Sequence, residues 1–436
     1  MTADDPTWAA ATRQVRAGYT AGVAQNTVTV PIYQSAAYEF ENFEAARDIF
    51  ALRRTGNLYS RTGNPTNTVL EQRVASLDGG LGALATASGQ SAVAVALLAL
   101  ARTGQHIVAS AKLYGGTVDL LDDTFADFGI GVTFVDPGDV AAWRAATTDA
   151  TRAWFVESIG NPTTSLPDLA ALAEAAHELD VPLVVDNTVA TPALLRPLDF
   201  GADIVVYSAT KFLGGHGSSL GGVIVDGGRF DFGARPERWT QFTRHSARFG
   251  LTFLTDIDGS HYLAYAKAKL AHDLGPALSP FNAFLLVQGV ETLDLRVRRH
   301  TESALAVAEH LAGHPAVTVV HHAGLPTHPD FRIGQRDFPH GTGSVFAFDL
   351  AADDDEVGPF IDRLRLFTLA ANIGDVRSLV VHPATTTHSR FTAAQREAAG
   401  ITLRTIRLSI GLEDPRDLIN DLDAALAAIE LQEAVA

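Results

Sequence analysis

Lys211 has the strongest chemical context of any side chain in the sequence. It is one of four lysines, and it follows a β-branched run over 204–206 and two hydroxyl residues, Ser208 and Thr210. Glycines at 214, 215 and 217 come directly after it. An ammonium group taken out of bulk water has a pKa below about 10.4 and becomes usable as a nucleophile or base. A lysine that forms a Schiff base is therefore the first hypothesis.

A carboxylate stands at the end of a second expected strand. Asp186 follows the apolar run 183–185, and the run 204–206 before Lys211 is the next expected strand. Two adjacent strand ends can place both side chains around one ring, where an acid would keep a pyridoxal nitrogen protonated. A helix cap or a structural hydrogen bond is the commoner role of such an aspartate taken alone.

Donors for a phosphate group lie at helix and loop positions. Ser88, Gly89 and Gln90 begin an expected helix over 91–101, and the first backbone N–H groups of a helix form a natural anion site. The hydroxyls before the lysine add further donors. Each feature also has a purely structural explanation, so only the combination favours a phosphorylated cofactor.

Four more side chains are candidates for binding. Tyr114, in a glycine turn, could stack on an aromatic cofactor or pack on its own domain. Tyr59 and Arg61 point the same way if the chain is extended, which would make an anion site. Arg407 is flanked by apolar residues in the expected strand 405–410, so it needs either a substrate carboxylate or a structural ion pair.

Other chemistries fit poorly. The Ser-x-x-Lys pattern that ends at Lys211 lacks the companion motifs of serine acyl enzymes, and the segment 215–221 misses the dinucleotide glycine spacing. The histidines at 310, 314, 321 and 322 have no carboxylate-rich motif around them, so no metal is expected.

Composition limits the classes of protein further. The 436 residues, 47% of them hydrophobic, are enough for two or three packed regions. No apolar run approaches the ~18 residues of a membrane helix and the start lacks a signal pattern, so a cytoplasmic protein without membrane contact is expected. The absence of cysteine excludes disulfides and thiolate chemistry. A net charge of −17 argues against a nucleic-acid partner.

The elements that must position these residues form three expected parts. Residues 1–61 resemble an arm, with an extended stretch over 28–34 and a helix over 43–52. Alternating helices and strands over 62–275, with an insert at about 226–273, favour a mostly parallel sheet covered on both faces. Residues 276–436 form the C-terminal domain, which Ser279 and Pro280 open as helix cap and first helical residue.

Short apolar runs predict strands buried on both faces. The expected strands are 106–109, 132–135, 153–156, 183–185 and 204–206. In the C-terminal domain we expect helices over 281–311 and 417–431 beside the strand 405–410.

Several motifs together resemble the Cys/Met metabolism family of pyridoxal phosphate (PLP) enzymes, fold type I. They occur in the family's order, at 59–66, 88–90, 113–117, 185–188, 208–212 and 407–413. The resemblance covers nearly the whole chain and implies an α/β fold: a mostly parallel central sheet flanked by helices, with a smaller C-terminal α/β domain. The segments 278–284, 371–379 and 382–388 and the long insert resemble the sulfhydrylase branch. The insert departs from that branch at 235–243, which concerns substrate preference.

The resemblance implies roles for the candidate residues. Lys211 and Tyr114 would be catalytic, Lys211 by holding PLP as a Schiff base and moving the α-proton, and Tyr114 by stacking on the ring that Asp186 anchors. Phosphate contacts would come from Ser88, Gly89, Gln90, Ser208 and Thr210, and from Tyr59 and Arg61 of a neighbouring subunit. The substrate carboxylate would be bound by Arg407, with Asn161 and the backbone near Ser378.

The implied reaction is a γ-replacement in methionine biosynthesis. Sulfide or a thiol would displace acetate from O-acetyl-L-homoserine and give homocysteine or its thioether. Active sites shared between subunits imply a homodimer or homotetramer. Cystathionine γ-synthase or γ-lyase activity, and a PLP-binding protein without catalysis, are the alternatives.

Overall fold

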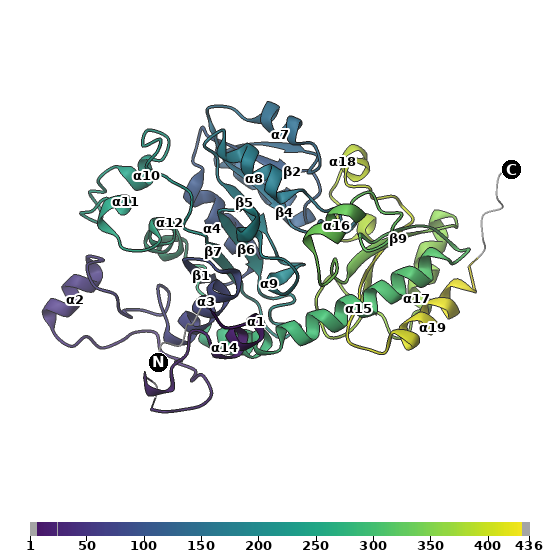
Figure 1. Ribbon diagram of the computed structural model, residues 1–436, viewed down its shortest axis with the longest axis horizontal. Coiled ribbons are helices and arrows are strands. Elements are labelled where there is room, and N and C mark those ends of the chain that lie inside the picture. Colours follow the sequence, from purple (N-terminus) through teal and green to yellow (C-terminus); the bar gives the residue numbers. More distant parts are fainter. Residues whose placement is uncertain (1–6, 24, 430–436) are drawn as a thin grey trace.

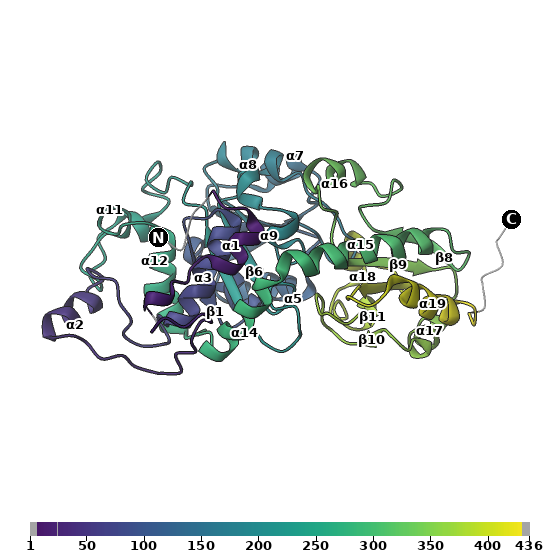
Figure 2. The same ribbon diagram turned by 60° about the horizontal axis from the view of Figure 1, so that its bottom comes forward.

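A computed structural model describes residues 7–23 and 25–429 of the chain. Figure 1 shows an N-terminal arm, a large α/β part around a central sheet, and a smaller α/β part at the C-terminal end. The helix α15 (Leu293–Ala312) runs from the large part along the smaller one (Figure 2). This arrangement agrees with the expected fold class.

The arm holds little regular structure. It contains α1 (Ala10–Arg16) and α2 (Phe43–Phe50), and α2 projects away from the large part in Figure 1. The Asn42 side chain caps α2 by accepting the Ala45 N–H at 2.8 Å. The expected extended stretch over 28–34 forms no strand.

The large part is built on a seven-stranded sheet in the order β1-β7-β6-β5-β4-β2-β3. Every neighbouring pair from β6 to β3 is parallel, and β7 is antiparallel to both of its neighbours. The strands are β1 (Gly82–Thr86), β2 (His106–Ser110), β3 (Gly131–Val135), β4 (Thr151–Glu157), β5 (Leu183–Asp186), β6 (Ile204–Ser208) and β7 (Gly222–Asp226). Five of them lie where the apolar runs predict strands, whereas β1 and β7 were not expected.

Helices bury both faces of this sheet. Neighbouring residues of β5 show the two faces, because Val185 packs in one hydrophobic cluster and Val184 in the other. The covering helices are α3 (Pro65–Asp78), α4 (Gly89–Leu100), α7 (Val140–Ala146), α8 (Leu169–His177) and α9 (Thr191–Leu194). A strand buried on both faces must be apolar throughout, which is the pattern that the sequence showed.

The insert packs against the C-terminal half of α4. It forms α10 (Thr240–Thr243), α11 (Phe253–Asp256), α12 (His261–Tyr265) and α13 (His272–Leu274). The Tyr262 hydroxyl donates to the Ala96 carbonyl at 2.9 Å, and the Gln241 amide donates to the Ala99 carbonyl at 3.0 Å. The divergent segment 235–243 therefore lies against the C-terminal half of α4, at the end of that helix opposite Ser88.

The expected long helix over 281–311 is two helices. α14 (Pro280–Glu291) ends where α15 begins, with Thr292 between them in a non-helical conformation. The Arg296 guanidinium donates to the Gly289 carbonyl at 2.7 Å and so satisfies an acceptor at the break. α14 packs on α3 of the large part.

The smaller part has a five-stranded sheet in the order β10-β11-β12-β9-β8. Its strands are β8 (Val317–His321), β9 (Val345–Leu350), β10 (Thr368–Leu369), β11 (Leu379–Val381) and β12 (Thr405–Ser409), and its helices besides α15 are α16 (Phe331–Asp337), α17 (Val357–Arg363), α18 (Ala393–Ala398) and α19 (Pro415–Leu426). The expected helix over 417–431 is α19, and its last two expected residues lie outside the described part of the chain. No helix in the part that the structure describes is long and apolar enough to cross a membrane.

Candidate active site

The carboxyl ends of three parallel strands meet at one edge of the large sheet. Glu157 ends β4, Asp186 ends β5 and Ser208 ends β6, and Glu157 and Asp186 are direct register partners. A cavity of about 610 Å³ opens at this edge between the large and small parts. Ligands bind at this place in open α/β sheets.

The cavity collects most of the residues that the sequence predicted for a site. Its walls include Ser88, Gly89, Gln90, Tyr114, Asn161, Asp186, Ser208, Thr210, Lys211 and Arg407. Three predicted residues, Tyr59, Arg61 and Ser378, lie outside this lining.

Lys211 lines the cavity, and the residue as a whole is half-buried. Its Nζ donates to the Asn372 Oδ1 at 2.6 Å. Burial, and next the Arg407 guanidinium, lower the pKa of Lys211 to about 8. A larger share of the amine is therefore uncharged near neutral pH than for a solvated lysine.

Asp186 faces the same cavity from the end of β5. Its Oδ1 accepts the Thr188 N–H at 2.9 Å, and burial raises the pKa of Asp186 to about 6. A cation beside this carboxylate would bind favourably, because its positive charge would offset the cost of burying the ionised form of Asp186.

The N-terminus of α4 supplies an anion cradle. Ser88 caps the helix, accepting the Ser91 N–H at 3.1 Å while its own N–H donates to the Ser91 hydroxyl at 3.0 Å. Gly89 packs on the end of β6, and a Cβ added there would lie 2.4 Å from the Ser208 Cβ. Only glycine lets the helix N-terminus come this close to the Ser208 and Thr210 loop.

Arg407 reaches the cavity from β12 in the small part. It is 3% exposed, and its Nη1 donates to the Asn161 Oδ1 at 3.2 Å and its Nη2 to the Asn372 carbonyl at 3.1 Å. Burial lowers the pKa of Arg407 to about 10. Among residues 7–23 and 25–429, no carboxylate pairs with it and its Nε has no hydrogen-bond partner. A buried guanidinium with only neutral partners is suited to an incoming anion.

Tyr59 and Arg61 lie on the arm. Tyr59 is 43% exposed, its ring centre is 5.5 Å from the Arg61 guanidinium carbon, and Arg61 donates to the His272 carbonyl. The structure therefore does not bring them to the cavity of their own chain.

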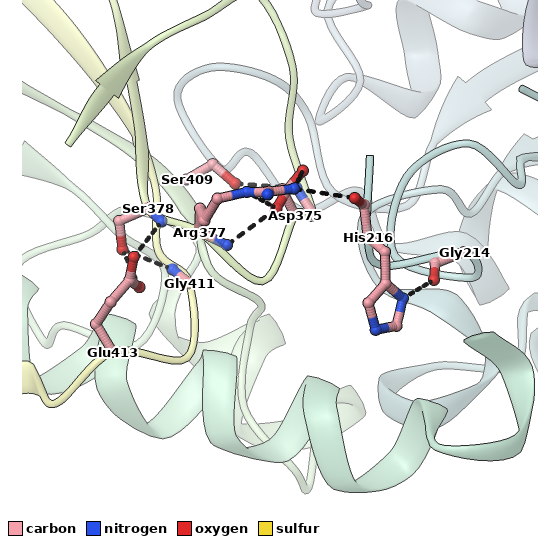
Figure 3. A network of polar contacts seen from close by, with 9 residues as sticks. Gly214, His216, Asp375, Arg377, Ser378, Ser409, Gly411 and Glu413 are labelled. Atoms are coloured by element: carbon pink, nitrogen blue, oxygen red, sulfur yellow. Dashed lines mark hydrogen bonds and ion pairs between the residues drawn. The ribbon is translucent and has the colours of Figure 1, made fainter. Parts of the chain in front are cut away.

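Ser378 is buried and its polar groups are already used. Its hydroxyl donates to the Glu413 Oε2 at 2.8 Å and accepts the Gly411 N–H at 2.8 Å, and its backbone N–H donates to Glu413 (Figure 3). The serine side chain therefore supports the loop rather than lining the cavity.

The loop that contains Ser378, residues 375–378, also contacts the glycine segment 214–217 after Lys211. The Val376 N–H donates to the Gly215 carbonyl at 3.0 Å. Arg377, paired with Asp375, donates to the His216 carbonyl at 3.0 Å (Figure 3). At Gly217, with φ of +63°, a Cβ would lie 2.2 Å from the Asp375 carboxylate. These hydrogen bonds join the small part to the large part at the residues that follow Lys211 in the sequence.

The sequence did not single out two cavity residues that the structure places beside the predicted ones. Asn372 lies in the segment 371–379, which served only to identify the branch, and Glu157 directly follows the apolar run 153–156. The pattern that pointed to Asp186, an acid just after a buried strand, would have pointed to Glu157 as well.

Among the described residues, no group of three histidine, aspartate or glutamate side chains lies close enough to hold a metal ion. The charged side chains in the cavity lining are Lys211, Asp119, Asp123, Glu157, Asp186, Arg390 and Arg407.

The fold and the cavity together define a class of protein. A lysine and an acid share the carboxyl edge of a mostly parallel sheet, and a helix N-terminus faces them. The O-acetylhomoserine (thiol)-lyase described from Campylobacter jejuni has a TM-score of 0.94 to this chain and 36% identity, covering 97% of this chain and 100% of its own, and carries N'-pyridoxyl-lysine-5'-monophosphate. The class is that of the pyridoxal phosphate enzymes of fold type I.

Within this class, the model of the Cys/Met metabolism PLP-dependent enzyme family matches residues 11–427, and the chain belongs to this family. The resemblance drawn from the motifs is thereby confirmed, and PLP is the cofactor.

Similar proteins carry one recurrent name. The chain is 46% identical to the O-acetyl-L-homoserine sulfhydrylase of Leptospira meyeri, over 92% of each chain. It is 45% identical to the sulfhydrylase of the same name from Corynebacterium glutamicum, over 97% of this chain and 98% of that one. The cystathionine gamma-lyase structure from Lactobacillus plantarum is more distant, with 31% identity and a TM-score of 0.83 over 98% of this chain and 100% of its own.

The residues present fit PLP. The lysine amine and the Asp186 carboxylate line one cavity, and the close approach of Gly89 to Ser208 leaves backbone and hydroxyl donors at one end of it. These donors suit a phosphate, and the acid suits a protonated ring nitrogen.

Proposed function

We propose that the chain is an O-acetyl-L-homoserine sulfhydrylase, which replaces the acetate of O-acetyl-L-homoserine by sulfide or a thiol. The products would be acetate and homocysteine or its thioether. Relatives at 45–46% identity that bear this name support the reaction. The observation that carries the catalytic assignment is that Lys211 and an Arg407 without a carboxylate partner face one cavity. The reaction would serve methionine biosynthesis in the cytoplasm.

Lys211 would hold the cofactor and then move protons at its Nζ. PLP, when bound, supplies an electron sink for the bond that breaks at the substrate α-carbon. The lowered pKa of Lys211 suits both roles, because its amine must be uncharged to attack a carbonyl or accept a proton. Asp186 would keep the ring nitrogen protonated, and Tyr114 would stack on the ring.

Arg407 would bind the substrate carboxylate. Its unused Nε and its neutral partners, Asn161 and the Asn372 carbonyl, support this role. Asn372 contacts both Lys211 and Arg407, so the bound carboxylate and the amine that moves the α-proton would be held at a fixed separation. Water would be excluded from this region by the small part, which carries Arg407.

The phosphate would be held by the N-terminus of α4 and the loop after β6. Ser88, Gly89, Gln90, Ser208 and Thr210 would contribute from one subunit. Tyr59 and Arg61, which lie on the arm away from their own cavity, would reach the phosphate of a second copy. This role requires a homodimer, or a homotetramer made of two such dimers.

Homocysteine release tests the proposal. The purified, PLP-loaded protein is given O-acetylhomoserine with sulfide, and in parallel O-succinylhomoserine, cysteine or cystathionine. We expect homocysteine from the acetyl substrate with sulfide and none from the Lys211→Ala variant. Cystathionine formed from cysteine, or cleaved without sulfide, would instead favour the cystathionine branch, and a bound cofactor with no product from any pair would favour a non-catalytic protein.

A further inference from the structure

Glu157 is the one carboxyl group that lies beside Asp186 at the edge of the described sheet. The two residues are register partners on the parallel strands β4 and β5, so their side chains leave the sheet on the same side. Glu157 is 7% exposed and lines the same cavity. The mechanism above gives it no role.

Glu157 holds the walls of the cavity through backbone contacts. Its Oε1 accepts the Tyr114 N–H at 2.6 Å, and the carboxyl group also accepts the Asn161 N–H. It thereby joins the turn that carries Tyr114 to the segment that carries Asn161. Neither contact requires a negative charge, because both carboxyl oxygens of a neutral acid retain lone pairs that accept hydrogen bonds.

The charges around Glu157 favour its uncharged form. The titratable groups that line the cavity with it are Asp186 on β5, Tyr114 in the turn, Lys211 after β6 and Arg407 on β12, together with Asp119, Asp123 and Arg390. Arg390 is paired with Asp119 at 2.8 Å. In the described part of the chain no cation pairs with Glu157. Burial, and next the charge of Asp186, raise the pKa of Glu157 well above its usual range. Two adjacent buried carboxyl groups do not both ionise readily.

We propose that Glu157 is a positioning residue that, as an uncharged acid, fixes the Tyr114 turn at the cavity wall and leaves Asp186 as the single charged carboxylate at this edge. This inference rests on the proposed roles of Asp186 and Tyr114 toward the cofactor. The two carboxyl groups then have different roles, because Asp186 carries the charge and Glu157 sets the geometry.

Two substitutions separate charge from position. Glu157→Gln keeps a carbonyl oxygen for the Tyr114 N–H but cannot ionise, whereas Glu157→Ala removes the acceptor. Glu71 provides matched controls, because its buried carboxyl accepts the Ala85 N–H at 2.9 Å and burial likewise raises its pKa, yet it does not line the cavity. Glu71→Gln and Glu71→Ala therefore report the general effect of changing a buried carboxyl group.

The cofactor itself gives the readout, without any substrate. The visible absorbance of the bound cofactor is titrated with pH, its visible circular dichroism is recorded, and its dissociation constant is measured for each variant. These measurements hold even if the protein makes no homocysteine, so failure of the sulfhydrylase assignment and failure of this inference are distinguishable. Thermal unfolding of each variant checks that it folds.

For Glu157→Gln we expect a titration midpoint within about 0.3 pH unit of the wild type and unchanged circular dichroism, because no charge is lost. For Glu157→Ala we expect weaker circular dichroism and about tenfold weaker cofactor binding, because the Tyr114 turn loses its support. The Glu71 variants should change neither spectrum.

Two results would overturn the inference. A midpoint lowered by about one unit or more in Glu157→Gln would mean that a negative charge had been removed, since losing an anion lowers the pKa of a nearby cation. Unchanged dichroism and affinity in Glu157→Ala would mean that Glu157 positions nothing, and if that variant fails to fold, the Glu157→Gln titration still decides the charge.

Discussion

At the scale of single residues, burial sets the reactivity of the lysine amine. Lys211 donates to an asparagine and has no carboxylate partner within the described ranges, so no negative charge offsets the cost of burying its positive charge. Its pKa falls to about 8 in consequence. A lysine side chain exposed to water would instead stay charged, and so unreactive as a nucleophile, at neutral pH.

The rate at which the apoprotein takes up PLP should follow this pKa. Attack on the cofactor aldehyde needs the uncharged amine, whose share rises as pH rises through the pKa of Lys211. The uptake rate should therefore climb with pH and level off above about 8. Stopped-flow absorbance from pH 6 to 10 checks this, and a rate still rising about tenfold per unit above pH 9 would contradict it.

Replacement of Arg407 should weaken substrate binding far more than it weakens the fold. In Arg407→Ala we expect kcat/KM to fall about 100-fold or more, because two charge-assisted hydrogen bonds to the carboxylate are lost. Arg407→Lys should recover only part of the loss, since an ammonium cannot bind a carboxylate with two parallel bonds. Steady-state kinetics measure both variants.

Arg416→Ala is the control for these kinetics. Arg416 is paired with Asp414, its side chain is 84% exposed, and neither residue lines the cavity. Unchanged kcat/KM in Arg407→Ala, with unfolding temperature also unchanged, would remove Arg407 from the substrate site.

At the scale of elements, close packing between a helix and a strand shapes the cradle. The N-terminus of α4 and the end of β6 approach so closely that a Cβ at Gly89 would meet Ser208. The backbone can shift to relieve such a contact only by moving the N–H groups that would face the proposed phosphate.

Gly89→Ala should therefore lose cofactor affinity. We expect the dissociation constant of PLP to rise about tenfold or more, with a loss of about 1–3 kcal/mol in the free energy of unfolding. Fluorescence titration of the apoprotein with PLP measures the first effect and denaturant unfolding the second.

Gly358→Ala is a matched control within a helix. Nothing lies within 4 Å of a Cβ there, so it should leave PLP affinity unchanged and stabilise the fold by up to about 1 kcal/mol. Equal affinity in Gly89→Ala and wild type would mean that α4 does not bind the phosphate.

At the scale of the whole molecule, the arm carries two predicted site residues that do not line the cavity of their own chain. Tyr59 and Arg61 lie outside the cavity of their chain, and α2 projects from the body in Figure 1. Large hydrophobic side chains on the arm are exposed, Phe43 at 84% and Phe50 at 66%. Such exposure is typical of a surface that another copy covers.

Mixing two inactive variants tests whether active sites are shared. Arg61→Ala and Lys211→Ala subunits are each expected to be inactive or nearly so, but a hybrid dimer has one site with both residues intact. After unfolding and refolding together in equal amounts, activity should return to about a quarter of the wild-type level, because half of the dimers are hybrids with one good site. The mixture is assayed for homocysteine release.

Refolding each variant alone is the control for this experiment. No recovery in the mixture, with hybrid dimers demonstrated by mass spectrometry of tagged subunits, would place Arg61 and Lys211 in the same chain's site or remove Arg61 from it.

The sequence by itself determined the class of fold and the centre of the site. Apolar runs buried on both faces predicted five of the seven strands, and an acid and a lysine just after two of them predicted the cavity edge. These features are local. A strand buried on both faces must be apolar, and the first polar residue after it lies at the edge of the sheet, where ligands bind.

Tertiary structure decided what depends on partners distant in sequence. β1 reads Gly-Ala-Leu-Ala-Thr, with weak strand propensity, and becomes a strand because it pairs with β7 about 140 residues later. The expected helix over 281–311 is interrupted at Thr292, next to the hydrogen bond that Arg296 donates to the Gly289 carbonyl. Asn372 contacts Lys211 although the two residues are 161 positions apart, and burial together with the neighbouring Asp186 raises the pKa of Glu157. Spacing along the chain cannot specify such contacts, since folding rather than sequence neighbourhood brings these groups together and removes the water between them.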